Sequence, residues 1–162
     1  MKNITIALLA IIIIAAVSLG IIKCMPLKTV EGLIKTAEHG SYSSLEKALN
    51  SNEPKNRIHA VQALLYLQTD EALKVLKSAT RDQNVIVRSA LVQGLNKIPK
   101  KKALPLLLIL LDDREFSIVR EALKTVKSHT GKNYLYTFEA TTEQKLKVIL
   151  ECKQDIQEET NK

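Results

Sequence analysis

Beyond Pro26, apolar residues recur every three or four positions along most of the chain. This spacing places them on one side of an α-helix, because about 3.6 residues complete a helical turn. No segment there keeps the strict alternation of apolar and polar residues that is typical of a strand. Leu, Ala, Lys and Glu dominate the composition, and all four favour helices. The pattern therefore predicts an all-α fold beyond Pro26.

The helical pattern repeats along the chain, with a period of about 31 residues. Its clearest markers are Arg57, Arg88 and Arg120, which follow one another at nearly equal intervals; we call them the arginine ladder. Mainly apolar residues follow each arginine at 3, 7 and 10 positions, along one helical stripe. In that order they are Ala60, Leu91 and Leu123, then Leu64, Leu95 and Lys127, then Leu67, Ile98 and Thr130. Each arginine thus opens a predicted helix that buries one face.

A second predicted helix completes each unit. Two similar apolar stretches, Ala72–Leu76 and Ala103–Leu107, begin at the same distance after the first two arginines. Pro99 ends the preceding helix, because a proline disfavours the α conformation at the residue before it. We expect Pro105 in the first turn of the second helix, where its missing N–H has no intrahelical acceptor. Polar links then supply side-chain oxygens that cap the next helix; they are residues 81–84 and 112–115.

Altered units flank the regular ones. Before Arg57, two apolar stripes predict a fainter helix pair, divided at residues 39–41. The stripes are Val30, Leu33, Ile34 and Ala37, followed by Leu45, Ala48 and Leu49. After Arg120, we expect the first helix to end near Thr130–Gly131, and a loop to follow through Tyr134, Tyr136 and Phe138.

The last predicted helix begins near Thr141. Thr141 and Gln144 have the spacing of a capping box, in which each side chain bonds the other's backbone N–H. Leu146, Ile149 and Leu150 are expected to form its apolar side.

These helix pairs resemble a known family. Pairs of about 30 residues that open with Val-Arg, as at Val87–Arg88 and Val119–Arg120, resemble the HEAT-like repeats of bacterial proteins, of the short type also found in phycobilisome lyases. The likeness covers residues 29–156, although Asn56 precedes Arg57 where the later units have valine. It implies an α-solenoid of three to four helix pairs, each burying its apolar face against its neighbours. Such a resemblance indicates a fold and leaves the function open.

The amino-terminal region carries an apolar segment. Residues 4–22 are almost wholly apolar, and their length matches the ~20 residues that cross a bilayer as a helix. A cleaved signal peptide is the alternative, since Ser18-Leu19-Gly20 offers small residues for a peptidase. Lipidation of Cys24 is disfavoured, because Lys23 stands where a small residue is expected. We expect a single-pass membrane protein with its repeat domain outside the cytoplasm, or a secreted or periplasmic protein after cleavage.

The 162 residues suffice for one ordinary domain. We divide them into a tail at 1–3, the transmembrane or signal segment at 4–22, a linker at 23–28, the solenoid at 29–156 and a flexible acidic tail at 157–162.

The charge is uneven along the chain. Residues 1–102 carry 15 Lys or Arg against 7 Asp or Glu, whereas residues 103–162 carry 9 against 10. A basic turn of Lys97, Lys100, Lys101 and Lys102 could contact anionic headgroups, each lysine adding about 1 kcal/mol. A solvated surface explains these lysines equally well. Nucleic acid is a less favoured partner, because base stacking needs exposed aromatic rings and the chain has no Trp, four Tyr and two Phe.

The arginine ladder admits two interpretations. It could be a track for anions, or each arginine could pair with the acidic link before it. The second interpretation pairs Arg88 with Asp82, and Arg120 with Asp112 or Asp113. The role is structural in similar repeats, so the resemblance favours the second interpretation.

Residues 104–111 are apolar on nearly all sides. Lys74, Lys77 and Ser78 are outward positions of the preceding second helix, and one repeat later they become Pro105, Leu108 and Ile109. A helix that is apolar all round must be covered on both sides. Either the last loop and helix cover it, or an exposed strip binds another protein. The candidate partner-binding residues are Lys74, Lys77, Pro105, Leu108 and Ile109.

The remaining sequence shows no chemistry of its own. His39, His59 and His129 are isolated, so no pair of metal ligands shares a helical face. Cys24 and Cys152 are expected to be unpaired thiols. There is no glycine-rich phosphate loop and no Gly-x-Ser-x-Gly nucleophile motif. We expect no cofactor and no enzymatic activity.

The sequence therefore favours a membrane-anchored scaffold for protein–protein interaction. Two alternatives stay open: an accessory factor for a tetrapyrrole cofactor, which the lyase-like repeats suggest, and a nucleic-acid-binding solenoid.

Overall fold

The computed structural model describes residues 27–38 and 42–160. The predicted membrane or signal segment at 4–22 and Cys24 lie outside these residues. Within them the chain forms eight α-helices and one 3-10 helix, without a strand. They are α2 (Leu27–Glu38), α3 (Ser43–Leu49), α4 (Pro54–Leu67), α5 (Asp70–Leu76), η1 (Lys77–Arg81), α6 (Val85–Leu95), α7 (Lys100–Leu110), α8 (Phe116–Thr130) and α9 (Thr142–Thr160). Of these described helices, none combines the length and the apolar character that a membrane crossing requires.

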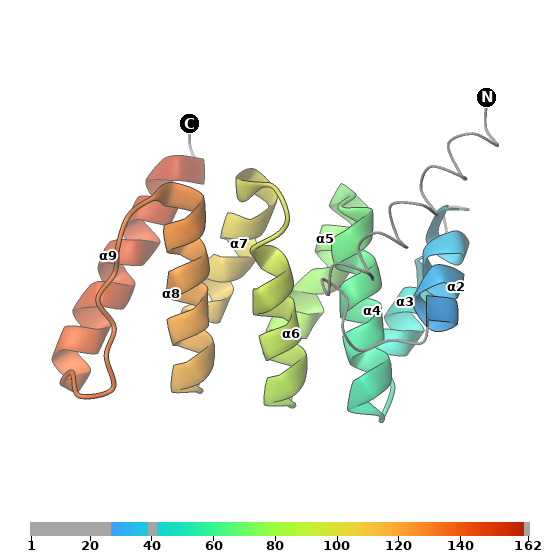
Figure 1. The fold of residues 1–162 in the computed structure, drawn as a ribbon, viewed down its shortest axis with the longest axis horizontal. Helices are drawn as coiled ribbons and strands as arrows, with labels where there is room; N and C mark the ends of the chain where they lie inside the picture. The colour runs from blue at the N-terminus through green and yellow to red at the C-terminus, as the bar shows by residue number, and fades with distance from the viewer. Residues whose placement is uncertain (1–26, 39–41, 161–162) are drawn as a thin grey trace.

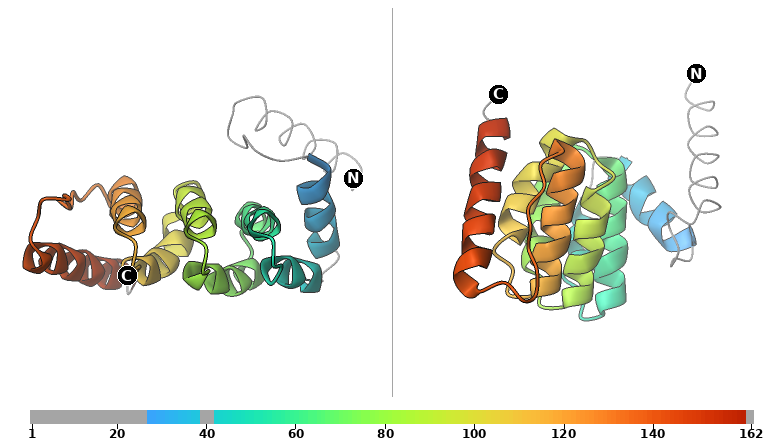
Figure 2. Two further views of the ribbon diagram at one scale, coloured as in Figure 1. Left: turned by 90° about the horizontal axis from the view of Figure 1, so that it is seen from below. Right: turned by 60° about the vertical axis from the view of Figure 1, so that its left-hand side comes forward.

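The helices stand in two rows. Helices α4, α6 and α8 lie side by side in the first row, and α3, α5, α7 and α9 form the second row behind it (Figures 1 and 2). Each first-row helix packs against the next one, α4 on α6 and α6 on α8, and α2 closes the amino-terminal end against α4. The predicted all-α solenoid is confirmed, and the fainter pair before Arg57 is present as α2 and α3.

One apolar core runs through all the units. The buried side chains extend from Ile34 in α2 to Ile156 in α9 without a division into separate clusters. The stripe residues that follow the arginines are fully buried at Ala60, Leu64, Leu91 and Leu95. Since each stripe is covered by the neighbouring unit, a single helix pair would leave its apolar face in water.

The predicted capping by the links between units is confirmed for residues 81–84 and wrong for residues 112–115, because the N-cap residue of α8, Glu115, makes no side-chain capping bond. The Asn84 side chain accepts a hydrogen bond from the Ile86 backbone N–H (2.8 Å) and caps α6. The Thr69 hydroxyl caps α5 by accepting from the Ala72 N–H (3.1 Å). At the other end of a helix, Gly131 adopts the left-handed conformation (φ 76°) and ends α8 where the sequence predicts.

The predicted place of Pro105 is wrong. Helix α7 begins at Lys100, so Pro105 lies in its interior rather than in its first turn. The proline cannot donate to the Lys101 carbonyl, a loss that ordinarily destabilises a helix interior. Its ring is exposed, whereas Leu104, Leu106 and Leu107 around it are buried. Apolar packing of α7 therefore offsets the missing hydrogen bond.

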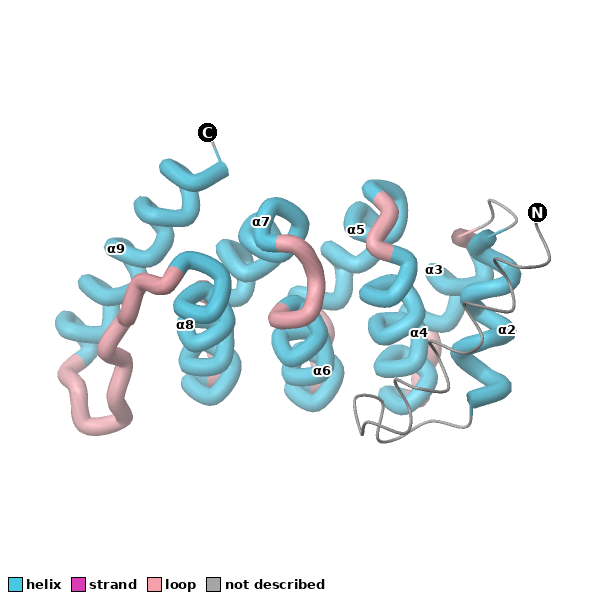
Figure 3. Tube along the Cα trace, turned by 45° about the horizontal axis from the view of Figure 1, so that its top comes forward, coloured by secondary structure: helices cyan, strands magenta, loops and turns pink. Residues whose placement is uncertain are grey.

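The last unit departs from the regular pattern. An extended loop, residues 131–141, returns the chain along α8 before α9 begins (Figure 3). Lys153 of α9 pairs with Asp112 just beyond the end of α7, and Glu159 pairs with Lys100 at its start. Helix α9 thus runs antiparallel to α7 and covers it. In the other units the second helix leads the chain back along the first helix, whereas in the last unit the loop does so before α9 begins.

Three predictions concern α9, and they have different outcomes. The capping box is confirmed: the Thr141 N–H donates to the Gln144 side chain (2.8 Å), and the Gln144 N–H donates to the Thr141 hydroxyl (3.2 Å). The predicted apolar side is wrong in part, because Ile149 packs on the core whereas Leu146 and Leu150 are exposed. The helix also continues to Thr160, within the segment expected to be a flexible tail.

A substitution at Gly94 tests how closely α4 and α6 pack. A Cβ atom at Gly94 would lie 2.1 Å from the Leu65 Cδ1 atom, whereas one at Gly32 in α2 would meet nothing within 4 Å. We expect Gly94→Ala to lower the free energy of unfolding by about 1–2 kcal/mol, since the clash exceeds the gain in helix propensity. Gly32→Ala is the control and should be neutral or stabilising. Urea unfolding of both variants measures the difference, and equal stabilities would contradict the close packing.

Candidate interaction surface

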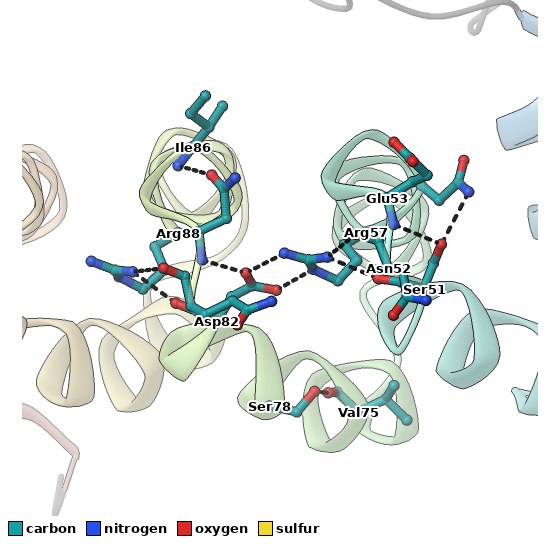
Figure 4. A network of polar contacts seen from close by, with 12 residues as sticks. Ser51, Asn52, Glu53, Arg57, Val75, Ser78, Asp82, Ile86 and Arg88 are labelled. Carbon is teal, nitrogen blue, oxygen red and sulfur yellow. Dashed lines mark hydrogen bonds and ion pairs between the residues drawn. The ribbon is translucent and has the colours of Figure 1, made fainter.

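Arg57 and Asp82 join two consecutive units. The Arg57 side chain, 5% exposed, donates from Nε to Asp82 Oδ2 (2.7 Å) and from Nη2 to Asp82 Oδ1 (2.9 Å). Its third nitrogen, Nη1, donates to the carbonyl oxygens of Ser51 (2.8 Å) and Asn52 (3.2 Å). The hydrogen bond to Asp82 raises the pKa of Arg57 against the opposing effect of burial. Each of the three nitrogens of this guanidinium therefore donates at least one hydrogen bond (Figure 4).

Arg88 repeats the arrangement one unit later. Its Nε and Nη2 atoms donate to the two carboxylate oxygens of Asp113 (2.6 and 2.8 Å), and its Nη1 donates to the Asp82 carbonyl (2.7 Å). The predicted pairing of Arg88 with the Asp82 carboxylate is therefore wrong. The near link contributes backbone oxygens, and the carboxylate comes from the link 25 residues further on.

Each of these aspartates also orders its own link. Asp82 Oδ1 accepts from the Asn84 N–H (2.8 Å), and Asp113 Oδ1 accepts from the Glu115 N–H (2.9 Å). One carboxylate therefore holds the arginine of the preceding unit and the backbone that leads into the next helix (Figure 4).

Arg120 does not continue this arrangement. Its side chain is exposed and lies over the Phe116 ring, 5.9 Å from the centroid. The residue at the repeat position of Asp82 and Asp113 is now Lys145, which also lies over that ring (5.1 Å). The predicted pairing of Arg120 with Asp112 or Asp113 is wrong, because Asp113 is bound to Arg88 and Asp112 to Lys153.

The predicted partner surface on the second row is only partly exposed. Lys74, Lys77 and Pro105 are exposed, whereas Leu108 and Ile109 are half-buried. Most other side chains of the apolar stretch are buried, since α9 lies against α7. The two alternatives concern the outward positions Pro105, Leu108 and Ile109, which are exposed or half-buried, so the binding of a partner there stays a prediction.

Two lysines of the basic turn make contacts between helices, and the other two are exposed. Lys100 pairs with Glu159 of α9, and Lys102 donates to the Gln68 carbonyl of the preceding unit. Lys97 and Lys101 are exposed. Contact with an anionic surface thus remains a prediction, and two of its four lysines already hold neighbouring helices together.

Aromatic residues attach the loop of the last unit. Tyr136 stacks on Phe116 of α8 with ring centroids 5.0 Å apart, and Phe138 meets the same ring edge-on at 5.7 Å. The Tyr134 hydroxyl donates to Asp155 Oδ2 of α9 (2.7 Å). Burial of Cys152 beneath this contact raises the pKa of its thiol to about 12, so the thiolate is scarce near neutral pH.

Two leucines of α9 form an apolar surface that sequence reasoning missed. Leu146 is 55% exposed and Leu150 is 65% exposed, one helical turn apart. They share one face of α9 with Thr142, Glu143, Lys147, Glu151 and Gln154. The sequence places Leu146, Ile149 and Leu150 on one side of the helix, and only the packing of α9 on α7 decides which of them is buried.

The described residues offer no metal site. No group of three or more His, Cys, Asp or Glu side chains converges among residues 27–38 and 42–160. Burial and the nearby Lys55 lower the pKa of His59, and His129 Nε2 lies 3.0 Å from the Leu95 carbonyl. His39 lies outside the described residues.

The comparisons with known proteins agree with this architecture. The model of one family, described as HEAT repeats, matches residues 42–126, just over half of the chain. The match does not extend to the phycobilisome-lyase type. No curated protein and no solved structure matches the chain.

The arginines provide a matched pair of variants. We expect Arg88→Ala to lower the free energy of unfolding by about 3–5 kcal/mol, because it leaves the buried Asp113 carboxylate without its partner. Arg120→Ala should change it by at most about 0.5 kcal/mol, as for other exposed positions. Chemical unfolding followed by circular dichroism measures both. Equal losses of unfolding free energy in the two variants would contradict the distinction between the ion-paired Arg88 and the exposed Arg120.

Proposed function

Because the chain belongs to the family of HEAT-repeat proteins, we propose that it is a non-enzymatic scaffold that binds another protein. Repeats of this family typically mediate protein–protein interaction. A solenoid suits this role, since stacked helices provide a long surface on a rigid support.

The exposed leucine pair of α9 is the observation that carries the proposal. Four of the six large apolar side chains that the described residues expose belong to the last unit: Leu135, Phe138, Leu146 and Leu150. Apolar side chains gathered on one surface mark interaction sites more often than single exposed ones do. Leu146 and Leu150 have the spacing at which one helix contacts another, with Lys147 and Glu151 beside them as a polar rim. We infer that an apolar segment of the partner lies along them.

We further propose that residues 4–22 hold the scaffold at a membrane, with the repeats outside the cytoplasm. The support is the length and apolar character of that segment in the sequence. Extraction of isolated membranes with alkaline carbonate tests the tether. The full chain should stay in the pellet and a variant without residues 4–22 should not; release of both would remove this part of the proposal.

Replacement of the leucines tests the binding role. The variant Leu146→Lys/Leu150→Lys should fold, because both side chains are exposed, and should lose photo-crosslinks formed from a reactive residue at position 147. The matched control is Val85→Lys/Ile86→Lys, which removes exposed apolar surface at the start of α6 and should keep the crosslinks. Crosslinks that persist in the α9 variant, or vanish equally in both, would refute a role for the leucine pair.

A further inference from the structure

The exposed face of α8 corresponds to a buried face of α6. In the repeat register, Arg120, Lys124 and Lys127 of α8 take the positions of Arg88, Val92 and Leu95 of α6. All three α6 residues are buried, with exposed fractions of 3%, 1% and 0%. Their spacing puts them on one helix side, and Arg88 shows its direction by reaching Asp113 in the next unit.

The corresponding face of α8 has no helix beside it in the first row. Helix α8 is the last of that row, and the chain continues from it as the loop (Figure 2). Arg120, Lys124 and Lys127 are all exposed. Lys124 lies 3.7 Å from Glu121 of its own helix, and its side chain is 75% exposed. We call these three side chains the α8 basic face.

A polar end is required of any solenoid, because an apolar one would aggregate. Any charged residues would meet that requirement. It does not explain why α8 has three cations where α6 has an arginine and two apolar residues, and it does not explain the position of Arg120. In both preceding units the same arginine is bound by a carboxylate of the following unit. Arg120 instead lies over the Phe116 ring, as does Lys145 from α9 of its own unit.

We propose that the α8 basic face receives an acidic helical segment of the partner protein, which lies along the three exposed cations beside the loop 131–141. This inference rests on the proposed function and names the chemistry of the partner. A carboxylate of the segment takes the place at Arg120 that Asp113 takes at Arg88, and two further acids lie opposite Lys124 and Lys127. Charge complementarity of this kind supplies specificity and faster association.

A second copy of the chain is a poorer occupant. The first described helix of such a copy is α2, where Glu31 already pairs with Lys35 (3.3 Å). The chain also carries a net charge of +7, so two copies repel each other.

A defined peptide tests the proposal. The probe is a fluorescent, helix-stabilised peptide with three glutamates at helical spacing, compared with the same peptide carrying glutamines. Fluorescence anisotropy should show that the glutamate peptide binds the full chain, and that Arg120→Gln/Lys124→Gln/Lys127→Gln weakens it about tenfold, as expected for three exposed ion pairs. The control, Lys47→Gln/Lys55→Gln/Arg81→Gln, removes the same charge from exposed positions of α3, α4 and η1 and should keep the affinity within about twofold.

Two results would overturn the proposal: equal weakening in both triple variants, which means unspecific attraction, or equal affinity for the glutamine peptide. The crosslinking at position 147 separates this inference from the proposed function. If the α8 variant keeps its crosslinks undiminished, the acidic segment is refuted and the scaffold role stands. If the wild-type chain forms no crosslink that depends on the leucine pair, the scaffold proposal fails whatever the peptide does.

Discussion

A buried guanidinium is stable only where oxygens replace the water that it loses, and this constraint joins the units of the solenoid. The near link can offer backbone carbonyls, as Ser51 and Asp82 do, but the carboxylate comes from the following unit. The arginine therefore cannot be satisfied within its own helix pair. Apolar packing between α4, α6 and α8 supplies the bulk of the stabilisation, and the ion pairs fix the register in which these helices pack.

The same need for oxygens around a buried arginine explains how the two ends of the stack differ from its middle. Ser51 occupies the repeat position of Asp82, and the chain has no arginine before Arg57 that would need a carboxylate there. At the other end, Arg120 lies over the Phe116 ring, as Lys145 does, instead of binding an acid. There the loop and the antiparallel α9 close the core. In the regular units, the side chains between neighbouring helices are thus bound to one another. The surfaces that we propose for a partner lie on the last unit.

Much of the fold follows from the sequence, because a regular repeat that carries a helical stripe allows few arrangements. The direction of the arginine pairing does not follow: Asp82 directly precedes the helix of Arg88, yet its carboxylate is held by Arg57. The contacts between units depend on how neighbouring units stack, and this cannot be predicted from the sequence pattern of one unit alone. The leucine pair was missed for a similar reason. Helix α9 carries two apolar stripes, and its antiparallel course on α7 buries Cys152 and Ile156 while exposing Leu146 and Leu150.

The coupling between Arg57 and Asp82 tests the central claim most directly. A double-mutant cycle with Arg57→Met and Asp82→Asn, followed by urea unfolding, isolates the interaction across the two units from the other contacts of each residue. A coupling free energy of about 1–3 kcal/mol is expected for a buried pair with two hydrogen bonds. Additive effects, with a coupling below about 0.5 kcal/mol, would show that the units are held together without the ladder.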